Sequence, residues 1–170
     1  VDSGSVTLGA GILAEYALRC ACSGMEASRI AELLEKKKED VCLIAMLDTL
    51  EYLKKGGRIS AAAAFAGGLL NIKPVVNVKD GVIHMLGKAR GSKQGSNLLA
   101  QAIGKTGGID FGLPILLGYS GLSDTLLKKY ITDSAPLWEG SVDTLRYTSI
   151  GSVVGTHAGP GAIAAAFFHK

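Results

Sequence analysis

Two side chains in this sequence have the chemistry to bind an anion, and both lie in glycine-rich segments. Arg58 follows Gly56 and Gly57, between two stretches whose apolar spacing predicts helices. Glycines at such a junction allow positive φ and close backbone approach, and a helix that begins at Ser60 would present unpaired N–H groups. An arginine beside a helix N-terminus can bind a carboxylate or a phosphate. The alternative is an ordinary glycine helix end with an exposed arginine.

The second side chain is His157, in the segment Thr156-His157-Ala158-Gly159-Pro160-Gly161. The sequence predicts a rigid loop here, just ahead of a strand of small apolar residues, and the loop has no bulky neighbours that would cover the imidazole. His157 and Arg58 could together form a two-donor cradle for a carboxylate or a phosphate, with Gly57 and Gly159 beside the ligand. The alternative is a histidine with a purely structural role.

The sequence favours binding over catalysis. It contains no nucleophile elbow, no Walker loop, no G-x-G-x-x-G fingerprint after a strand and no metal-binding cluster, so we predict no catalytic residue, metal or cofactor. Cys20, Cys22 and Cys42 are odd in number and lack metal-ligand spacing, which predicts buried, reduced thiols in a cytoplasmic protein. A net charge of +3 is too small to indicate a nucleic-acid partner.

Length and composition indicate one folded domain. The chain has 170 residues, of which 48% are hydrophobic, enough for a sizeable core. The longest apolar run, residues 59–70, is well short of the roughly 20 residues that span a bilayer, so no transmembrane segment is expected. Val1-Asp2-Ser3-Gly4 carries no secretory signal, although a processed chain would look the same.

Apolar periodicity and turn residues predict alternating helices and strands. Asp80-Gly81 between two β-branched runs is the strongest hairpin signal. The pattern favours an α/β or α+β layered domain with a mixed β-sheet flanked by helices, whose strand order the sequence does not reveal. The expected helices are 7–22, 25–38, a turn near 46–52, 61–70, about 94–105 and 125–132, and the expected strands are 41–46, 72–78, 82–90, 113–120, 142–147 and 162–168.

Several motifs, in their order along the chain, carry a resemblance to a known family. They are 47–60, with its Gly-Gly-Arg, then Leu70-Asn71-Ile72-Lys73-Pro74, Asp80-Gly81, Lys88-Ala89-Arg90-Gly91, and Thr156-His157-Ala158-Gly159-Pro160-Gly161. Together they resemble the DegV family of bacterial fatty-acid-binding proteins, over nearly the whole chain. The resemblance begins part way into the family pattern, so residues 1–170 are similar to the C-terminal lobe of a two-lobe protein whose N-terminal lobe is absent from this chain.

The resemblance implies a non-catalytic carrier. Members bind one long-chain fatty acid, with the tail buried in this lobe and the carboxylate near the interlobe cleft, and some are the binding subunit of a fatty-acid kinase. The resemblance also implies that Arg58 and His157 help to hold the carboxylate, while hydroxyl contacts come from the other lobe. Ala158 stands where members often have threonine, which removes one hydroxyl and leaves the histidine in place.

A buried acyl tail needs a tunnel with small apolar walls, and residues 61–70 and 162–168 have that composition. Phe65, Leu69 and Ile163 are the candidate tunnel residues. Each buried methylene contributes about 0.8 kcal/mol, so the tail would dominate the affinity and Arg58 would mainly set the orientation. The alternative for the small residues is tight packing between a helix and the sheet.

Two other functions stay open at this stage. Because the family fold is similar to that of dihydroxyacetone kinases, the glycine-rich site could belong to a phosphate-handling enzyme. The chain could instead be a lipid-independent interaction module that docks a kinase partner. A lobe on its own would also expose apolar surface, which predicts self-association. The preferred acyl chain is not predicted.

Overall fold

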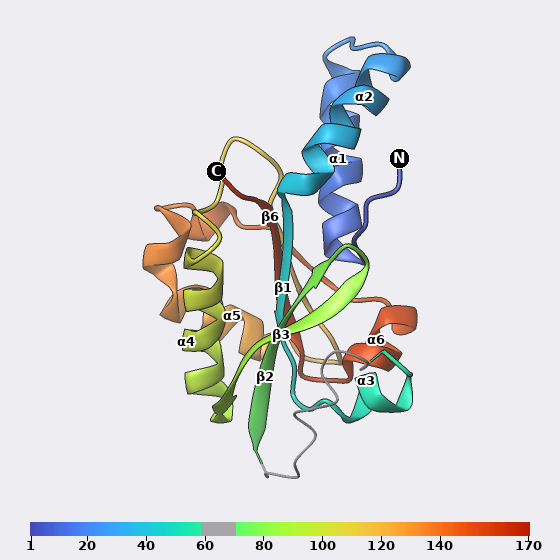
Figure 1. Ribbon diagram of the computed structural model, residues 1–170. Coiled ribbons are helices and arrows are strands. Elements are labelled where there is room, and N and C mark those ends of the chain that lie inside the picture. Colours follow the sequence, from blue (N-terminus) through green and yellow to red (C-terminus); the bar gives the residue numbers. More distant parts are fainter. Residues whose placement is uncertain (59–70) are drawn as a thin grey trace.

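The computed structural model describes residues 1–58 and 71–170, which form a mixed six-stranded sheet with helices on both faces (Figure 1). The strand order is β3-β2-β1-β6-β4-β5, in which only β4 and β5 pair in parallel. The strands are β1 Val41–Met46, β2 Ile72–Lys79, β3 Val82–Arg90, β4 Leu116–Tyr119, β5 Tyr147–Ser149 and β6 Ile163–Phe168. The expected helix 61–70, with Phe65 and Leu69, lies outside the described residues.

The helices separate into two layers. In Figure 1 the sheet is seen nearly edge-on, with α1 and α2 on one side and α4 and α5 on the other. The α-helices are α1 Leu8–Cys22, α2 Ala27–Lys37, α3 Glu51–Lys55, α4 Gly91–Gly104, α5 Thr125–Asp133 and α6 Ser152–Ala158. Short 3₁₀ turns are η1 Lys38–Asp40, η3 Ala135–Trp138 and η4 Val142–Thr144. The predicted α/β layered domain with a mixed sheet is confirmed.

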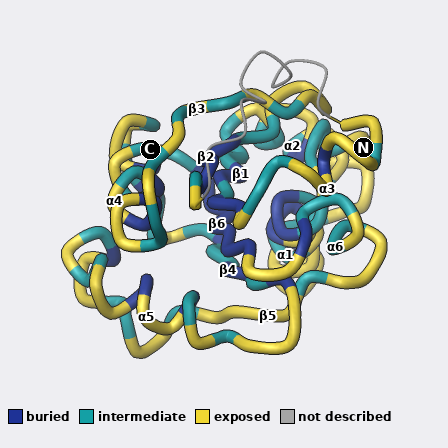
Figure 2. The backbone as a smooth tube through the Cα atoms, turned by 90° about the horizontal axis from the view of Figure 1, so that it is seen from below, coloured by how far each residue is buried: buried dark blue, intermediate teal, exposed yellow. Residues whose placement is uncertain are grey.

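Strand β6 is the centre of the molecule. All six of its residues are buried, because both faces of this strand are covered by helices (Figure 2). Its odd-numbered side chains face the α4 and α5 layer, where they join the core around Trp138, and its even-numbered side chains face α1. Its neighbours are β1 and β4, both antiparallel to it.

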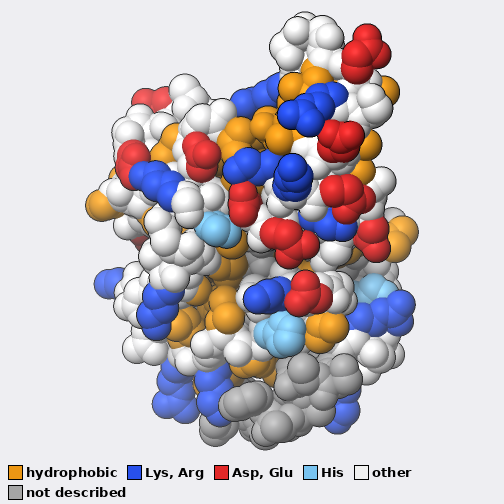
Figure 3. All heavy atoms as spheres, turned by 45° about the horizontal axis from the view of Figure 1, so that its top comes forward, with side chains coloured by type: hydrophobic (Ala, Val, Ile, Leu, Met, Phe, Trp, Pro, Cys, Tyr) orange, Lys and Arg blue, Asp and Glu red, His pale blue; other side chains and the backbone are white. Residues whose placement is uncertain are grey.

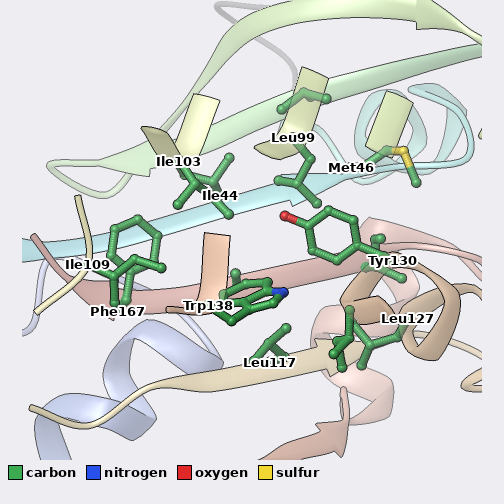
Figure 4. Close-up of a cluster of buried hydrophobic side chains, with 14 residues drawn as sticks. Ile44, Met46, Leu99, Ile103, Ile109, Leu117, Leu127, Tyr130, Trp138 and Phe167 are labelled. Atoms are coloured by element: carbon green, nitrogen blue, oxygen red, sulfur yellow. The ribbon is translucent and has the colours of Figure 1, made fainter. Parts of the chain in front are cut away.

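The larger core lies between the sheet and the α4 and α5 layer (Figure 4). Trp138 is completely buried there, and its indole Nε1 donates a hydrogen bond of 3.1 Å to the Ser134 hydroxyl. The Tyr130 and Trp138 rings meet edge to face at 6.0 Å. Burial raises the pKa of the Tyr130 phenol above its usual range. Trp138 is the sole tryptophan of the chain, so its fluorescence reports on this core.

The hairpin of β2 and β3 has the predicted turn. Asp80 and Gly81 have φ of 52° and 71°, and two positive φ angles are what a type I′ turn requires.

Two other predictions were wrong. Residues 142–147 form η4 and only the first residue of β5, because Thr144 bonds back to the Ser141 carbonyl through both its N–H and its hydroxyl. The predicted loop at His157 is instead the last turn of α6, whose glycines had masked the helix.

The three cysteines are free thiols in different surroundings. Cys20 is buried, Cys42 is half-buried and Cys22 is exposed. The prediction of three buried thiols was therefore wrong for Cys22, which lies at the end of α1 on its outer face. Burial raises the pKa of the Cys42 thiol. Within residues 1–58 and 71–170, no helix is long and apolar enough to cross a bilayer.

Gly95 allows α4 to approach the sheet closely. A Cβ at this position would lie 3.0 Å from Lys73 Cβ and would overlap Met46 Sδ. We expect Gly95→Ala to lower the free energy of unfolding by about 1–2 kcal/mol, because overpacking outweighs the gain in helix propensity. Urea denaturation followed by Trp138 fluorescence measures the change.

Gly104, the last residue of the same helix, is the matched control because nothing lies within 4 Å of its Cβ position. Gly104→Ala should leave stability unchanged or raise it by up to about 1 kcal/mol. Equal effects of the two substitutions would contradict the packing explanation.

Candidate functional site

Arg58 and His157 are brought together by the sheet. The chain that leaves β1, residues 47–58, is called here the β1 arm, and the chain that enters β6, residues 150–162, the β6 arm. Met46 at the end of β1 pairs with Ile163 at the start of β6, so both arms join the sheet at the same end of these two strands. The two arms contact each other through α3 and α6, which lie side by side beyond that end (Figure 1).

Gly56 is the point at which the two arms touch. A Cβ on Gly56 would overlap the imidazole of His157, lying 2.6 Å from Cε1 and still closer to Nδ1. The carbonyl of the same glycine accepts a 2.6 Å hydrogen bond from the Arg58 guanidinium. The Gly56 carbonyl therefore fixes the Arg58 side chain, and the absence of a side chain at Gly56 leaves room for the His157 imidazole.

The contact with Gly56 decides which nitrogen of His157 can serve a ligand. Nδ1 is buried and has no hydrogen-bond partner among the described residues. Nε2 is therefore the nitrogen available to an incoming group. Arg58 is exposed, and one of its terminal nitrogens, Nη1, donates to the Gly56 carbonyl. An anion between Arg58 and Nε2 of His157 could accept a hydrogen bond from each.

Two further glycines shape the arms. Gly57 has φ of 69°, with nothing within 4 Å of its Cβ position, so it serves the turn of the backbone. Gly159 has φ of 75°, and a Cβ there would lie 2.7 Å from Cε2 of Tyr52. The Tyr52 ring of α3 thus packs on the backbone of Gly159 at the end of α6. Gly57 and Gly159 were predicted from the sequence as ligand-binding residues, whereas Gly56, whose Cβ position overlaps the His157 imidazole, was not.

An apolar cavity of about 370 Å³ begins beside these two side chains. Arg58 and His157 line it, and its wall includes residues of β2, β1 and β6, of α6 and of the N-terminal segment. The other lining residues are Ser5, Val6, Thr7, Leu43, Ala45, Leu47, Leu53, Val76, Val78, Gly81, Ile83, Ile150, Val153, Val154, Ala158, Ala162 and Ala164. The site thus combines a polar end with a long hydrocarbon wall.

Ala162, just before β6, and Ala164 of β6 form one part of the cavity wall. Ile163, the tunnel residue suggested by the sequence, points through the opposite face of the sheet into the core with Trp138. The prediction of Ile163 was wrong, because the period of two that separates the faces of a strand puts its neighbours, and not Ile163, on the cavity side. Ala45 of β1 pairs directly with Ala164 and lines the same cavity.

A second hollow of about 620 Å³ lies farther along β1 and is polar. Charged groups of both signs line it, among them Lys38, Glu39 and Asp80. Acidic and basic side chains are also interspersed on the outer faces of α1 and α2 (Figure 3), where Arg19 pairs with Glu15 at 2.7 Å. In the part of the chain that the structure describes, no three His, Cys, Asp or Glu residues are grouped to hold a metal ion.

The family is decided by a comparison with known sequence families. The model described as "Uncharacterised protein, DegV family" matches residues 1–170. The chain belongs to the DegV family. It is 33% identical over 170 residues to a DegV domain-containing protein of Clostridium perfringens, covering 98% of this chain and 57% of that protein. A DegV domain-containing protein of Caldanaerobacter subterraneus is 31% identical, with coverages of 100% and 59%. The chain thus spans just under three fifths of these relatives.

Solved DegV structures have the same fold. A DegV family protein of Thermus thermophilus, described by its fatty acid binding, matches with a TM-score of 0.84 and 27% identity, covering 100% of this chain and 60% of that one. A fatty acid binding DegV family protein of Streptococcus agalactiae matches with a TM-score of 0.81 and 29% identity, with coverages of 100% and 59%. A Streptococcus pneumoniae protein described as Fatty Acid Kinase (Fak) B3, loaded with linoleic acid, shares the fold at 21% identity and a TM-score of 0.82, with coverages of 100% and 59%.

Proposed function

We propose that this chain binds a long-chain fatty acid, with the acyl tail in the apolar cavity and the carboxylate between Arg58 and His157. The observation that carries the proposal is a cavity whose wall is apolar and whose end beside α3 and α6 holds these two donors. The related proteins of Thermus thermophilus and Streptococcus agalactiae, both described as binding fatty acids, support the same class of ligand.

The two parts of the site contribute differently to binding. Each methylene buried in the cavity contributes about 0.8 kcal/mol, so the tail supplies most of the affinity. A hydrogen bond to a charged group contributes about 1.5–3 kcal/mol, and the exposure of Arg58 places its share at the low end. Arg58 and His157 therefore select the carboxylate and fix which end of the lipid faces outward.

Palmitate binding by the delipidated chain, measured against hexadecanol, tests this function. We expect the wild type to bind palmitate at least about tenfold more tightly than hexadecanol, and Arg58→Ala to remove most of that difference while leaving the alcohol bound. A chain that binds neither lipid at micromolar concentration, or that binds both equally, would overturn the assignment. Lys55 is an exposed cation three residues before Arg58. Lys55→Ala is therefore the control and should keep the wild-type preference.

We further propose that the chain is a non-catalytic cytoplasmic carrier that presents the carboxylate to a separate fatty-acid kinase. The exposed position of Arg58 supports this role, because the carboxylate would sit where a second protein can reach it. Incubation with a fatty-acid kinase, ATP and labelled palmitate should yield acyl phosphate only when this chain is present. ATP turnover by the chain alone would instead indicate an enzyme.

A further inference from the structure

Lys73 is an almost buried cation at the start of β2. Only 11% of its side chain is exposed, and its ammonium group pairs with the carboxylate of Asp48. The Asp48 side chain is 53% exposed. Ammonium groups are rarely buried unless they are paired, because an unpaired buried charge is costly. Loss of the partner is therefore more costly in free energy for the buried Lys73 ammonium group than for the half-exposed Asp48 carboxylate.

Asp48 stands where the two arms meet the sheet. It is the second residue of the β1 arm, and its predecessor Leu47 donates a 2.9 Å hydrogen bond to the carbonyl of Pro74 in β2. On its other side, Asp48 Cβ lies 3.5 Å from the Cβ position of Gly161, in the β6 arm. Asp48, in the β1 arm, thus pairs with the second residue of β2 and lies close to Gly161 in the β6 arm.

The β6 arm is also fixed to the sheet close to this point. The N–H of Gly161 donates a 2.8 Å hydrogen bond to the Ser120 carbonyl, and the N–H of Ser120 donates one of 2.9 Å to the Ala162 carbonyl. The start of the β1 arm is joined to β2 by the Asp48–Lys73 pair and the Leu47 hydrogen bond, and its Leu47 lies in a buried cluster with Val76 and Ala162. The Asp48–Lys73 pair is therefore placed to set the angle at which the β1 arm leaves the sheet.

We propose that Asp48 and Lys73 are positioning residues for the head-group site: their ion pair fixes the β1 arm against the β6 arm and so sets the separation of Arg58 from His157. This inference rests on the proposed fatty-acid function. A shift of the β1 arm moves Gly56 off the imidazole and Arg58 away from the carboxylate, whereas only three of the 19 residues that line the cavity, Leu47, Leu53 and Arg58, belong to that arm. Loss of the pair therefore reduces head-group selection and spares tail binding.

The test compares palmitate with hexadecanol in the 170-residue chain carrying Asp48→Asn, Lys73→Met or both. We expect Asp48→Asn to reduce the ratio of palmitate to hexadecanol affinity about tenfold while changing hexadecanol affinity by less than about twofold. Lys73→Met should have a smaller effect, because the half-exposed Asp48 carboxylate stays hydrated. The double variant leaves no buried charge unpaired, so it can be measured even if Asp48→Asn fails to fold. Its ratio of palmitate to hexadecanol affinity should also be reduced about tenfold.

The exposed pair of Lys129 and Asp133 on α5 provides the control, and Asp133→Asn should keep the wild-type ratio. If the pair has a purely structural role, the Asp48 and Lys73 variants will lose affinity for both lipids equally, and that result would overturn the inference. A double variant with the wild-type ratio would also overturn it. A wild-type chain without any preference for palmitate would instead remove the proposed function itself, so the two failures are distinguishable.

Discussion

Gly56→Ala should weaken palmitate binding by about 10- to 100-fold while the chain stays folded. The added methyl group would overlap the His157 imidazole, which must leave its place beside the cavity. Gly56 itself has φ of −81° and ψ of 0°, angles that alanine adopts without strain. The backbone of the β1 arm therefore tolerates the substitution, and the cost falls on the position of the histidine.

A double-mutant cycle shows whether the methyl group acts through His157. We expect His157→Ala to weaken palmitate binding as Gly56→Ala does, and the double variant to be no weaker than His157→Ala alone. Titration calorimetry with palmitate measures all four affinities, and thermal unfolding followed by Trp138 fluorescence checks the fold. Additive losses would mean that the methyl group disturbs the site by another route, and an unchanged affinity of Gly56→Ala would show that His157 does not contact the ligand.

Sequence patterns predicted the elements whose signals are local. Strand β1 was expected at 41–46 and is found there, because a short apolar run between charged residues has few alternatives. The hairpin was predicted because Asp80-Gly81 can adopt two positive φ angles. The family resemblance, carried by the order of several motifs, is confirmed over the whole chain. The strand order was not predictable, because it depends on which apolar faces meet across the fold.

The errors in the secondary structure also have physical causes. Gly151, Gly155 and Gly159 gave α6 the composition of a loop, although the N–H of Gly155 donates to the Gly151 carbonyl and that of Gly159 to the Gly155 carbonyl. Contact with α3, including the packing of Tyr52 on Gly159, compensates for the poor helix propensity of these residues. Tertiary packing of this kind has no local signature in the sequence.

For the site, the sequence named both polar groups and missed most of what holds them. Arg58 and His157 were recognisable by residue type and glycine neighbours. The importance of Gly56 depends on His157, which is far away in the chain, so nothing around Gly56 distinguishes it from Gly57. Alternation along the predicted strand 162–168 could have indicated Ala162 and Ala164 in place of Ile163.

Ala45→Leu should shorten the acyl chain that the cavity accepts. Ala45 lines the cavity from β1, opposite Ala164 of β6, and its side chain is only partly buried because the cavity lies in front of it. Leucine adds three carbons that occupy volume otherwise available to the tail. Displacing two to three methylenes, at about 0.8 kcal/mol each, weakens stearate binding by about 2 kcal/mol, or roughly 30-fold.

Affinities for decanoic, dodecanoic, tetradecanoic, palmitic and stearic acids measure this effect. In the wild type the affinity should rise with each added methylene until the cavity is filled, and in Ala45→Leu the rise should stop two to three carbons earlier. Acids whose tails end before the added side chain should bind both proteins equally. Ala14→Leu, on the exposed face of α1, is the matched control and should leave the whole series unchanged.

The shape of the series separates tail burial from damage to the fold. Equal weakening at every chain length would indicate a distorted sheet, since a displaced tail end affects only the acids that reach it. A rise that continues to stearic acid in Ala45→Leu would place the tail outside this cavity. Because the leucine fills space that the protein leaves empty, thermal stability should be unchanged or raised, so weaker stearate binding cannot be assigned to unfolding.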